Sequence, residues 1–135
     1  MLAAVKNGNV KELAELMRQD PGFDVNEQNE NGWTLLHLVY CYHSRSTVIP
    51  ILLAHPDIDV NVKNYSGGTP YYLACYWGCT SCVREMLKDS RVKVNEPDDD
   101  GATPLWRAAW NGRLDVIRWW IACLWEGDGS RETRG

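Results

Sequence analysis

Three cysteines lie close together in the middle of the chain, where Cys75, Cys79 and Cys82 form the pattern CxxxCxxC. A Cys-x-x-Cys pair is typical of redox-active dithiols and of half-sites for zinc. A zinc site would need a fourth ligand, and Cys41 or His43 would have to supply it. Burial of the thiols as small apolar side chains is the simpler interpretation, so we expect no metal. A metal-linked or redox-linked role is the weaker alternative.

The remaining residues that could do chemistry do not form a catalytic set. The histidines are His37, His43 and His55, and none has a nucleophile and an orienting carboxylate at a spacing typical of a triad. The Gly-Gly-Thr stretch at 67–69 is too short for a phosphate-binding loop. We therefore expect a protein that is not an enzyme and that uses no cofactor.

The segment TPYYLACYWG, residues 69–78, carries more large side chains than one helix face can bury. An amphipathic helix needs one apolar stripe, whereas Tyr71, Tyr72, Tyr76 and Trp77 would extend around more than one side. Some of these rings must belong to the core, and others must face a second surface. The positions of these rings on the predicted helices determine which belong to the core and which face the second surface.

Composition limits the class of protein. The chain has 135 residues, and its 14 basic and 18 acidic residues give a net charge of −4, which is a poor match to nucleic acid. No apolar run approaches the roughly 18 residues of a membrane-spanning helix, and the first residues lack the pattern of a signal peptide. Five cysteines, an odd number, favour reduced thiols. We expect one domain in the cytoplasm, with the nucleus as the alternative.

Two short motifs recur along the chain with one period. A Gly-x-Thr turn begins at positions 32, 67 and 101, so its spacings are 35 and 34 residues. A Val-Asn motif ends at positions 26, 61 and 95, with the same two spacings. Two independent markers with a common period indicate tandem copies of one supersecondary unit.

Each copy is predicted to contain a turn, a first helix, a short loop and a second helix. Thr34, Thr69 and Thr103 are suited to cap the first helix, and proline follows two of them at the first helical position. Glycine at 78 and 112 is placed to end that helix. The second helix carries apolar residues at i, i+3 and i+4, which predicts one buried stripe.

These offsets, GxTPLHxA followed by Gly, VxxLL and DVN in units of about 33 residues, resemble the ankyrin repeat family over residues 1–122. The resemblance implies an all-α solenoid of stacked helix-turn-helix units joined by β-turn fingers. We predict one ankyrin-repeat domain over residues 1–126 and a polar, frayed tail at 127–135. The predicted units span about 1–29, 30–64, 65–98 and 99–126.

The resemblance also assigns a slot to each ring of the segment at 69–78. Tyr71 aligns with Leu36 and Leu105, which predicts a core position. His37 keeps the family histidine, expected to link neighbouring turns, whereas Tyr72 replaces it in the next unit. In this family the late positions of the first helix and the turn tips line a concave groove. The predicted partner-binding residues are Trp33, Tyr42, Tyr65, Tyr76, Trp77, Asp99, Asp100, Trp110 and Asn111.

The predicted function is a non-catalytic scaffold that binds a partner protein or peptide through aromatic anchors. The acidic turn tip at Asp99 and Asp100 favours a basic partner. One alternative is a methyl-lysine or basic-peptide reader, with Trp77, Trp110 and Asp99 as the cage. The other is a regulatory or targeting segment of a larger enzyme or multidomain protein.

Two further expectations concern modification and self-association. Asn61 and Asn95, which follow Val in the exit motif, resemble asparagines that are hydroxylated in ankyrin domains. The last predicted helix is apolar on its outer side, with Trp119 expected to face away from the stack and Trp125 without a slot. Since a solenoid end needs a polar face, we expect that the chain is a piece of a longer protein, that the final segment folds back as a cap, or that this end pairs with a second copy.

Overall fold

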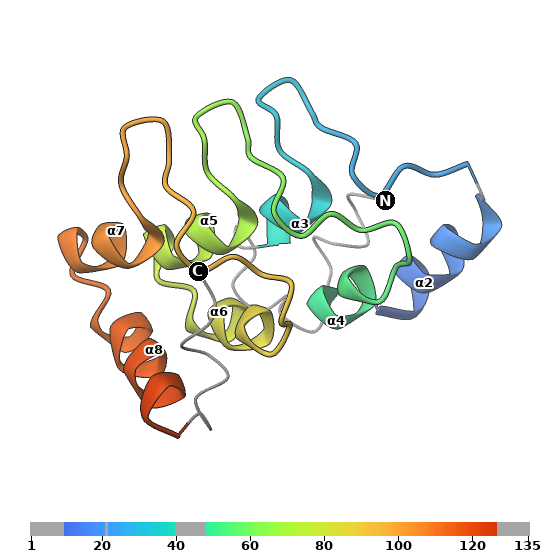
Figure 1. Cartoon of the computed structure of the whole chain (residues 1–135). Helices are drawn as coiled ribbons and strands as arrows, with labels where there is room; N and C mark the ends of the chain where they lie inside the picture. The colour runs from blue at the N-terminus through green and yellow to red at the C-terminus, as the bar shows by residue number, and fades with distance from the viewer. Residues whose placement is uncertain (1–9, 21, 40–47, 127–135) are drawn as a thin grey trace.

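The computed structural model describes residues 10–20, 22–39 and 48–126, and it is all-α in this part of the chain, as predicted. First helices α3, α5 and α7 lie side by side beneath three protruding fingers, and second helices α4, α6 and α8 form another row (Figure 1). None of the described helices is long and apolar enough to cross a membrane. The helices are α2 (Val10–Gln19), α3 (Leu35–Leu38), α4 (Ile49–Leu53), α5 (Pro70–Trp77), α6 (Thr80–Leu87), α7 (Pro104–Trp110) and α8 (Leu114–Glu126).

A threonine caps each first helix, which confirms the prediction. The Thr69 hydroxyl accepts the N–H of Tyr72 at 3.1 Å, and the Thr103 hydroxyl accepts the N–H of Trp106 at 3.2 Å. Proline is the first helical residue of α5 and α7, where a backbone N–H would have no helical partner. Gly78 ends α5 with φ of 72°, a left-handed conformation that glycine adopts without steric cost.

One side-chain oxygen organises each finger. Asn64 Oδ1 accepts the N–H groups of Ser66 and Gly68, both at 3.0 Å. Asn29 and Asp98 make the same two contacts in the neighbouring fingers. This Asx turn fixes the tip, and the Asn64 N–H closes the finger by donating to the Gly68 carbonyl at 2.9 Å.

Neighbouring fingers contact one another at their tips. The Tyr65 N–H donates to the Asn31 carbonyl, and the Asp99 N–H donates to the Ser66 carbonyl, both at 3.2 Å. Gly67 lies at this contact with φ of 86°, and a Cβ added there would be 2.5 Å from the Asp99 backbone nitrogen. The close approach of the fingers therefore requires glycine at this position.

We expect Gly67→Ala to lower the free energy of unfolding by at least about 2 kcal/mol, because it adds a backbone clash to left-handed strain. Gly101→Ala is the matched control: φ is 84°, but nothing lies within 4 Å of an added Cβ. That variant should lose only about 1–2 kcal/mol. Urea denaturation measures both, and equal losses would contradict the finger contact at Gly67.

The main core runs between the two rows of helices. Tyr71 is only 2% exposed, which confirms its predicted core position. Ala74 of α5 and Ala108 of α7 are fully buried. Small residues at these positions let the first helices approach closely, so the stack presents a rigid surface beside the fingers.

His37 links two units, as expected. It is fully buried, its Nδ1 accepts the Thr34 N–H at 3.0 Å, and its Nε2 lies 2.9 Å from the Gly68 carbonyl oxygen. Since Nδ1 accepts, the proton belongs on Nε2, which donates to Gly68. Burial lowers the pKa of His37 to about 4, even though its backbone hydrogen bonds raise the pKa. The ring is therefore neutral at pH 7.

Candidate functional site

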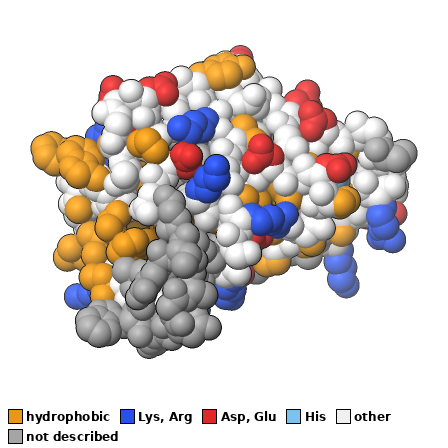
Figure 2. Space-filling model, viewed as in Figure 1, with side chains coloured by type: hydrophobic (Ala, Val, Ile, Leu, Met, Phe, Trp, Pro, Cys, Tyr) orange, Lys and Arg blue, Asp and Glu red, His pale blue; other side chains and the backbone are white. Residues whose placement is uncertain are grey.

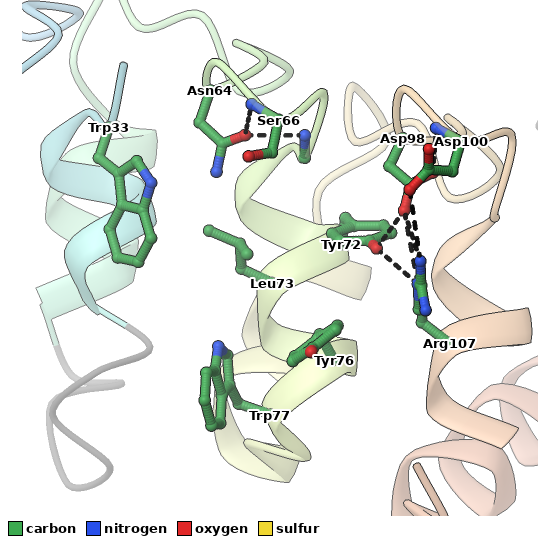
Figure 3. Close-up of a pocket in the computed structure, with 11 residues that line it drawn as sticks. Trp33, Asn64, Ser66, Tyr72, Leu73, Tyr76, Trp77, Asp98, Asp100 and Arg107 are labelled. Carbon is green, nitrogen blue, oxygen red and sulfur yellow. Dashed lines mark hydrogen bonds and ion pairs between the residues drawn. The ribbon is translucent and has the colours of Figure 1, made fainter. Parts of the chain in front are cut away.

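A pocket of about 350 Å³ opens between the fingers and the first helices (Figure 3). We call it the aromatic pocket. One side is apolar, and the other carries two carboxylates and one guanidinium. The aromatic pocket is lined by Trp33, Asn64, Ser66, Gly68, Tyr72, Leu73, Tyr76, Trp77, Asp98, Asp100 and Arg107.

The apolar side is a continuous run of rings. Tyr72 and Leu73 are buried as a small cluster, and Trp33 and Tyr76 pack against it. The ring centroids of Tyr72 and Tyr76 are 6.2 Å apart, and those of Tyr76 and Trp77 are 5.3 Å apart in an edge-to-face arrangement. Trp77 is 48% exposed. These rings form a wall that is fixed by packing at Tyr72, near the fingers, and is most exposed at Trp77, at the other end of α5 (Figure 3).

The charged side is held by a hydrogen-bonded triad from α5, α7 and the last finger. The Tyr72 hydroxyl donates to Asp98 Oδ2, and Arg107 Nε donates to the Tyr72 hydroxyl oxygen at 3.0 Å and to Asp98 Oδ2 at 3.4 Å. Figure 3 shows both side chains pointing at Asp98. Asp100 Oδ2 lies 4.0 Å from the Arg107 guanidinium, and this carboxylate is 87% exposed. Asp100 is thus the acid available to a partner.

These contacts fix the protonation states in the triad. Burial, followed by the hydrogen bond to Asp98, raises the pKa of Tyr72 to about 12. For Asp98 burial alone would raise the pKa, but hydrogen bonds from Tyr72 and from the amides of Ala102 and Asp100 outweigh burial, so its pKa is below the usual value. Tyr72 is neutral at pH 7, while Asp98 is ionised.

Four of the predicted site residues line the aromatic pocket: Trp33, Tyr76, Trp77 and Asp100. A fifth, Asn111, has a positioning contact, because its Nδ2 donates to the Tyr76 carbonyl at 3.2 Å. Asn111 is the C-cap of α7, so this bond holds the end of α5 against the end of α7. A binding role for these residues remains a prediction.

Two other predicted residues lie at the finger tips. Tyr65 is 68% exposed at a finger tip, where its ring lies against Gly32. Asp99 is at the next tip, close to Gly67. Neither residue lines the aromatic pocket, and Tyr42 lies outside the described residues. Tyr65 and Asp99 thus lie at the finger tips, outside the aromatic pocket.

Trp110 pairs with a tryptophan that the sequence analysis did not select. Its ring stacks on Trp106, with centroids 5.2 Å apart and planes 8° apart, and the Arg107 guanidinium lies 5.2 Å from the Trp106 ring centre. Trp106 is 49% exposed and Trp110 is 71% exposed. The available signal was the alignment of Trp106 with His37, a slot that faces the neighbouring unit. Of the three residues of the methyl-lysine cage, Trp77 lines the aromatic pocket, whereas Trp110 and Asp99 do not. The cage stays a prediction.

The cysteine cluster is buried. Cys75, Cys79 and Cys82 are each under 5% exposed and none is in a disulfide. Within the described ranges no group of three ligand residues could hold a metal ion. The other ligands considered, Cys41 and His43, lie outside those ranges.

The two candidate modification sites differ in their surroundings. Asn61 Nδ2 donates to the Arg91 carbonyl at 3.0 Å, and Asn61 Oδ1 accepts the Lys93 N–H at 2.9 Å. Its amide therefore joins one exit turn to the next. Asn95 is exposed. Hydroxylation of either asparagine stays a prediction.

The last unit exposes apolar side chains. Leu114 is 62% exposed and Ile121 44%, and apolar atoms gather at the end of the molecule formed by α7 and α8 (Figure 2). Trp119 is 38% exposed and lies 4.5 Å below the Arg84 guanidinium, which covers one face of the ring. The Trp125 side chain lies outside the described atoms. Self-association through this end stays a prediction.

The comparison with protein families agrees with the stacked units. The profile of ankyrin repeats in three copies matches residues 1–98 and, in a second placement, residues 51–124. The chain belongs to the ankyrin repeat family. Membership supports a role in protein–protein interaction.

Three curated relatives illustrate where such units occur. The human SMC5-SMC6 complex localization factor protein 1 is 36% identical over 93 residues, which cover 69% of this chain and 9% of that protein. Alpha-latrotoxin-Lg1a of Latrodectus geometricus is 33% identical over 82% of this chain and 8% of the toxin. The Saccharomyces cerevisiae target of rapamycin complex 2 subunit AVO2 is 27% identical over 96% of this chain and 31% of its own length. The chain thus spans a minor part of each relative.

Proposed function

We propose that this protein is a non-catalytic interaction module that binds a partner protein or peptide in the aromatic pocket. The observation that carries the proposal is the half-exposed ring wall of Trp33, Tyr76 and Trp77 beside the charged triad. Aromatic anchors on a rigid surface give much buried area at low entropic cost. The pocket volume, about 350 Å³, suits one or two large side chains of a peptide.

The partner side chain that best fits the charged side is lysine or arginine. Two carboxylates, Asp98 and Asp100, face one guanidinium, Arg107, so the local charge is negative by one. Asp98 already accepts from Tyr72, Arg107 and two backbone amides, whereas Asp100 is mostly exposed. A cationic head could contact Asp100 while its alkyl stem lies on the ring wall. We propose the cytoplasm, or alternatively the nucleus, as the compartment.

Selection from a random peptide phage library on the immobilised chain tests this proposal. We expect enriched peptides that contain at least one Lys or Arg next to an apolar residue. For a selected synthetic peptide, Trp77→Ala should weaken binding by about 10-fold or more, since interface tryptophans cost about 2 kcal/mol when truncated. Asp100→Asn should weaken it less, by about 2–5-fold, and the loss should shrink at high salt.

The matched control is Trp119→Ala, which removes a tryptophan that is also partly exposed but lies on α8. Its affinity for the selected peptide should equal that of the wild type. The proposal is wrong if no peptide is enriched, or if Trp77→Ala binds as tightly as Trp119→Ala while both remain folded.

A targeting role in a larger assembly is the second candidate. Two observations favour it. The chain matches only 9% of the length of one relative and 31% of another, and the name of the first describes a localization factor. The aromatic pocket would then supply the docking contact. A fluorescent fusion of the chain should lose its localisation when Trp77 is replaced by alanine, and unchanged localisation would argue against this role.

A further inference from the structure

Two cysteines at the junction of α5 and α6 have no part in the proposed binding of a partner in the aromatic pocket. Cys79 is the N-cap residue of α6, and Cys82 lies in the first turn of the same helix. They are 4% and 1% exposed, so Cys79 is the one nearer to solvent. The junction follows directly after Trp77 and Gly78, where the chain turns from the first row of helices into the second.

The two sulfur atoms are unusually close. Cys79 Sγ lies 2.7 Å from Cys82 Sγ, within hydrogen-bond distance of the other thiol. A disulfide bond is about 2.05 Å long, so bond formation requires a movement of well under 1 Å. We propose that Cys79 and Cys82 form a dithiol site that hydrogen peroxide oxidises to an intramolecular disulfide.

The positions of the two thiols assign them different roles. Cys79 is the N-cap residue of α6 and so lies at the positive end of the helix dipole. A thiolate at this end of a helix is stabilised by the dipole, which makes Cys79 the nucleophile. Contact with Cys79, and burial, raise the pKa of Cys82 above the usual range. Cys82 therefore stays a thiol until it acts as the resolving group.

The reaction balances in two steps. The Cys79 thiolate attacks one oxygen of the peroxide, the O–O bond breaks, and after proton transfer Cys79 is a sulfenic acid and one water is released. The Cys82 sulfur then attacks the Cys79 sulfur, the S–O bond breaks, and the Cys82 proton leaves with the hydroxide as a second water. Two thiols have lost two electrons and two protons, and one peroxide has become two waters.

The other described cysteines serve as internal controls. Cys75 is 1% exposed on α5, where its thiol contacts the Tyr71 side chain. Cys123 is half-buried on α8. Neither has a sulfur–sulfur contact among the hydrogen bonds of the described residues. Selective oxidation of the Cys79–Cys82 pair is therefore the specific expectation, as opposed to general oxidation of the chain.

The test uses the full, reduced chain treated with hydrogen peroxide, followed by iodoacetamide and digestion with trypsin and chymotrypsin. Cleavage after Trp77 and Arg84 yields the peptide 78–84, GCTSCVR, which contains only these two cysteines. We expect this peptide to become lighter by two hydrogen atoms and to carry no alkyl group, and dithiothreitol should reverse the change. Cys75 and Cys123 should remain alkylated.

Variants and denaturant separate the proposal from nonspecific oxidation. Cys75→Ala should leave the mass change intact, whereas Cys82→Ser should trap a sulfenic acid at Cys79 that dimedone labels. In denaturant the wild-type disulfide should form at least 10-fold more slowly, because the two sulfurs are no longer held together. Alkylation of both cysteines after peroxide, a bond to Cys75, or equal rates in native buffer and denaturant would each overturn the proposal.

Discussion

Replacing Tyr71 by alanine is expected to lower the free energy of unfolding by about 3–5 kcal/mol, the range for removal of a buried aromatic side chain. Tyr71 is 2% exposed and belongs to the main core, with Leu36, Leu52 and Val83 in the same cluster. Its removal takes away apolar contact area and leaves a cavity that rigid helices cannot close. Urea denaturation followed by circular dichroism measures the loss.

Trp110→Ala is the control for Tyr71→Ala, because it removes an exposed aromatic side chain. Trp110 has a larger side chain, but it is 71% exposed and its ring stacks on Trp106. We expect a loss within about 1 kcal/mol, which is the value of one exposed aromatic pair. If Trp110→Ala destabilised the chain as much as Tyr71→Ala, the division of the aromatic residues into core and surface would be wrong.

The second large effect is a loss of stability in mild acid that depends on His37. The pKa of its ring is about 4 in the folded chain against 6.5 for an unperturbed histidine, because the ring is buried. The unfolded chain therefore takes up the proton first, and stability falls as the pH falls from 6.5 towards 4. This difference between the two pKa values lowers the free energy of unfolding by about 3 kcal/mol at pH 4. Above pH 6.5 the neutral ring causes no such loss.

His37→Gln separates this effect from other titrations. The variant loses stability at pH 7, since the Thr34 amide and the Gly68 carbonyl need partners that glutamine does not reproduce. Its urea midpoint should nevertheless change less between pH 7 and pH 4 than that of the wild type. Parallel pH curves for the two proteins would contradict a buried neutral His37.

Residue types at fixed offsets were sufficient to predict the architecture. The threonine caps, the helix-starting prolines and the core position of Tyr71 follow from local rules that each unit repeats. The family slot of His37 likewise predicted a link between turns, and the contact to Gly68 confirms it. These features depend on backbone position, which the period of 34 to 35 residues determines.

The composition of the candidate site was harder to predict, because it depends on side-chain direction. Trp77 and Trp110 occupy the same row of helices, yet one lines the aromatic pocket and the other turns to stack on Trp106. The slot of Arg107 gave no sign that its guanidinium would reach across to Tyr72 of the preceding unit. Alignment of units identifies which positions face a neighbour, but rotamers and contacts between units determine what that neighbour meets.

The aromatic pocket has the features expected of a preorganised binding surface. The rings of Tyr72, Tyr76 and Trp77 stand on α5, which packs between α3 and α7, and the acidic side of the pocket is fixed by the Tyr72–Asp98–Arg107 contacts. Little side-chain freedom is then lost when a partner binds, so more of the contact energy contributes to affinity. Variation of the partner can be accommodated at the exposed rim formed by Trp77 and Asp100.

The central claim is that a partner binds against the rings of the aromatic pocket, and the indole N–H spectrum tests it most directly. The chain has seven tryptophans, so a ¹H–¹⁵N spectrum resolves an indole signal for each. On titration with a peptide selected on the wild-type chain, we predict that the signals of Trp33 and Trp77 shift and that the signal of Trp119 does not. A shift at Trp119 with Trp33 and Trp77 unchanged would contradict the claim.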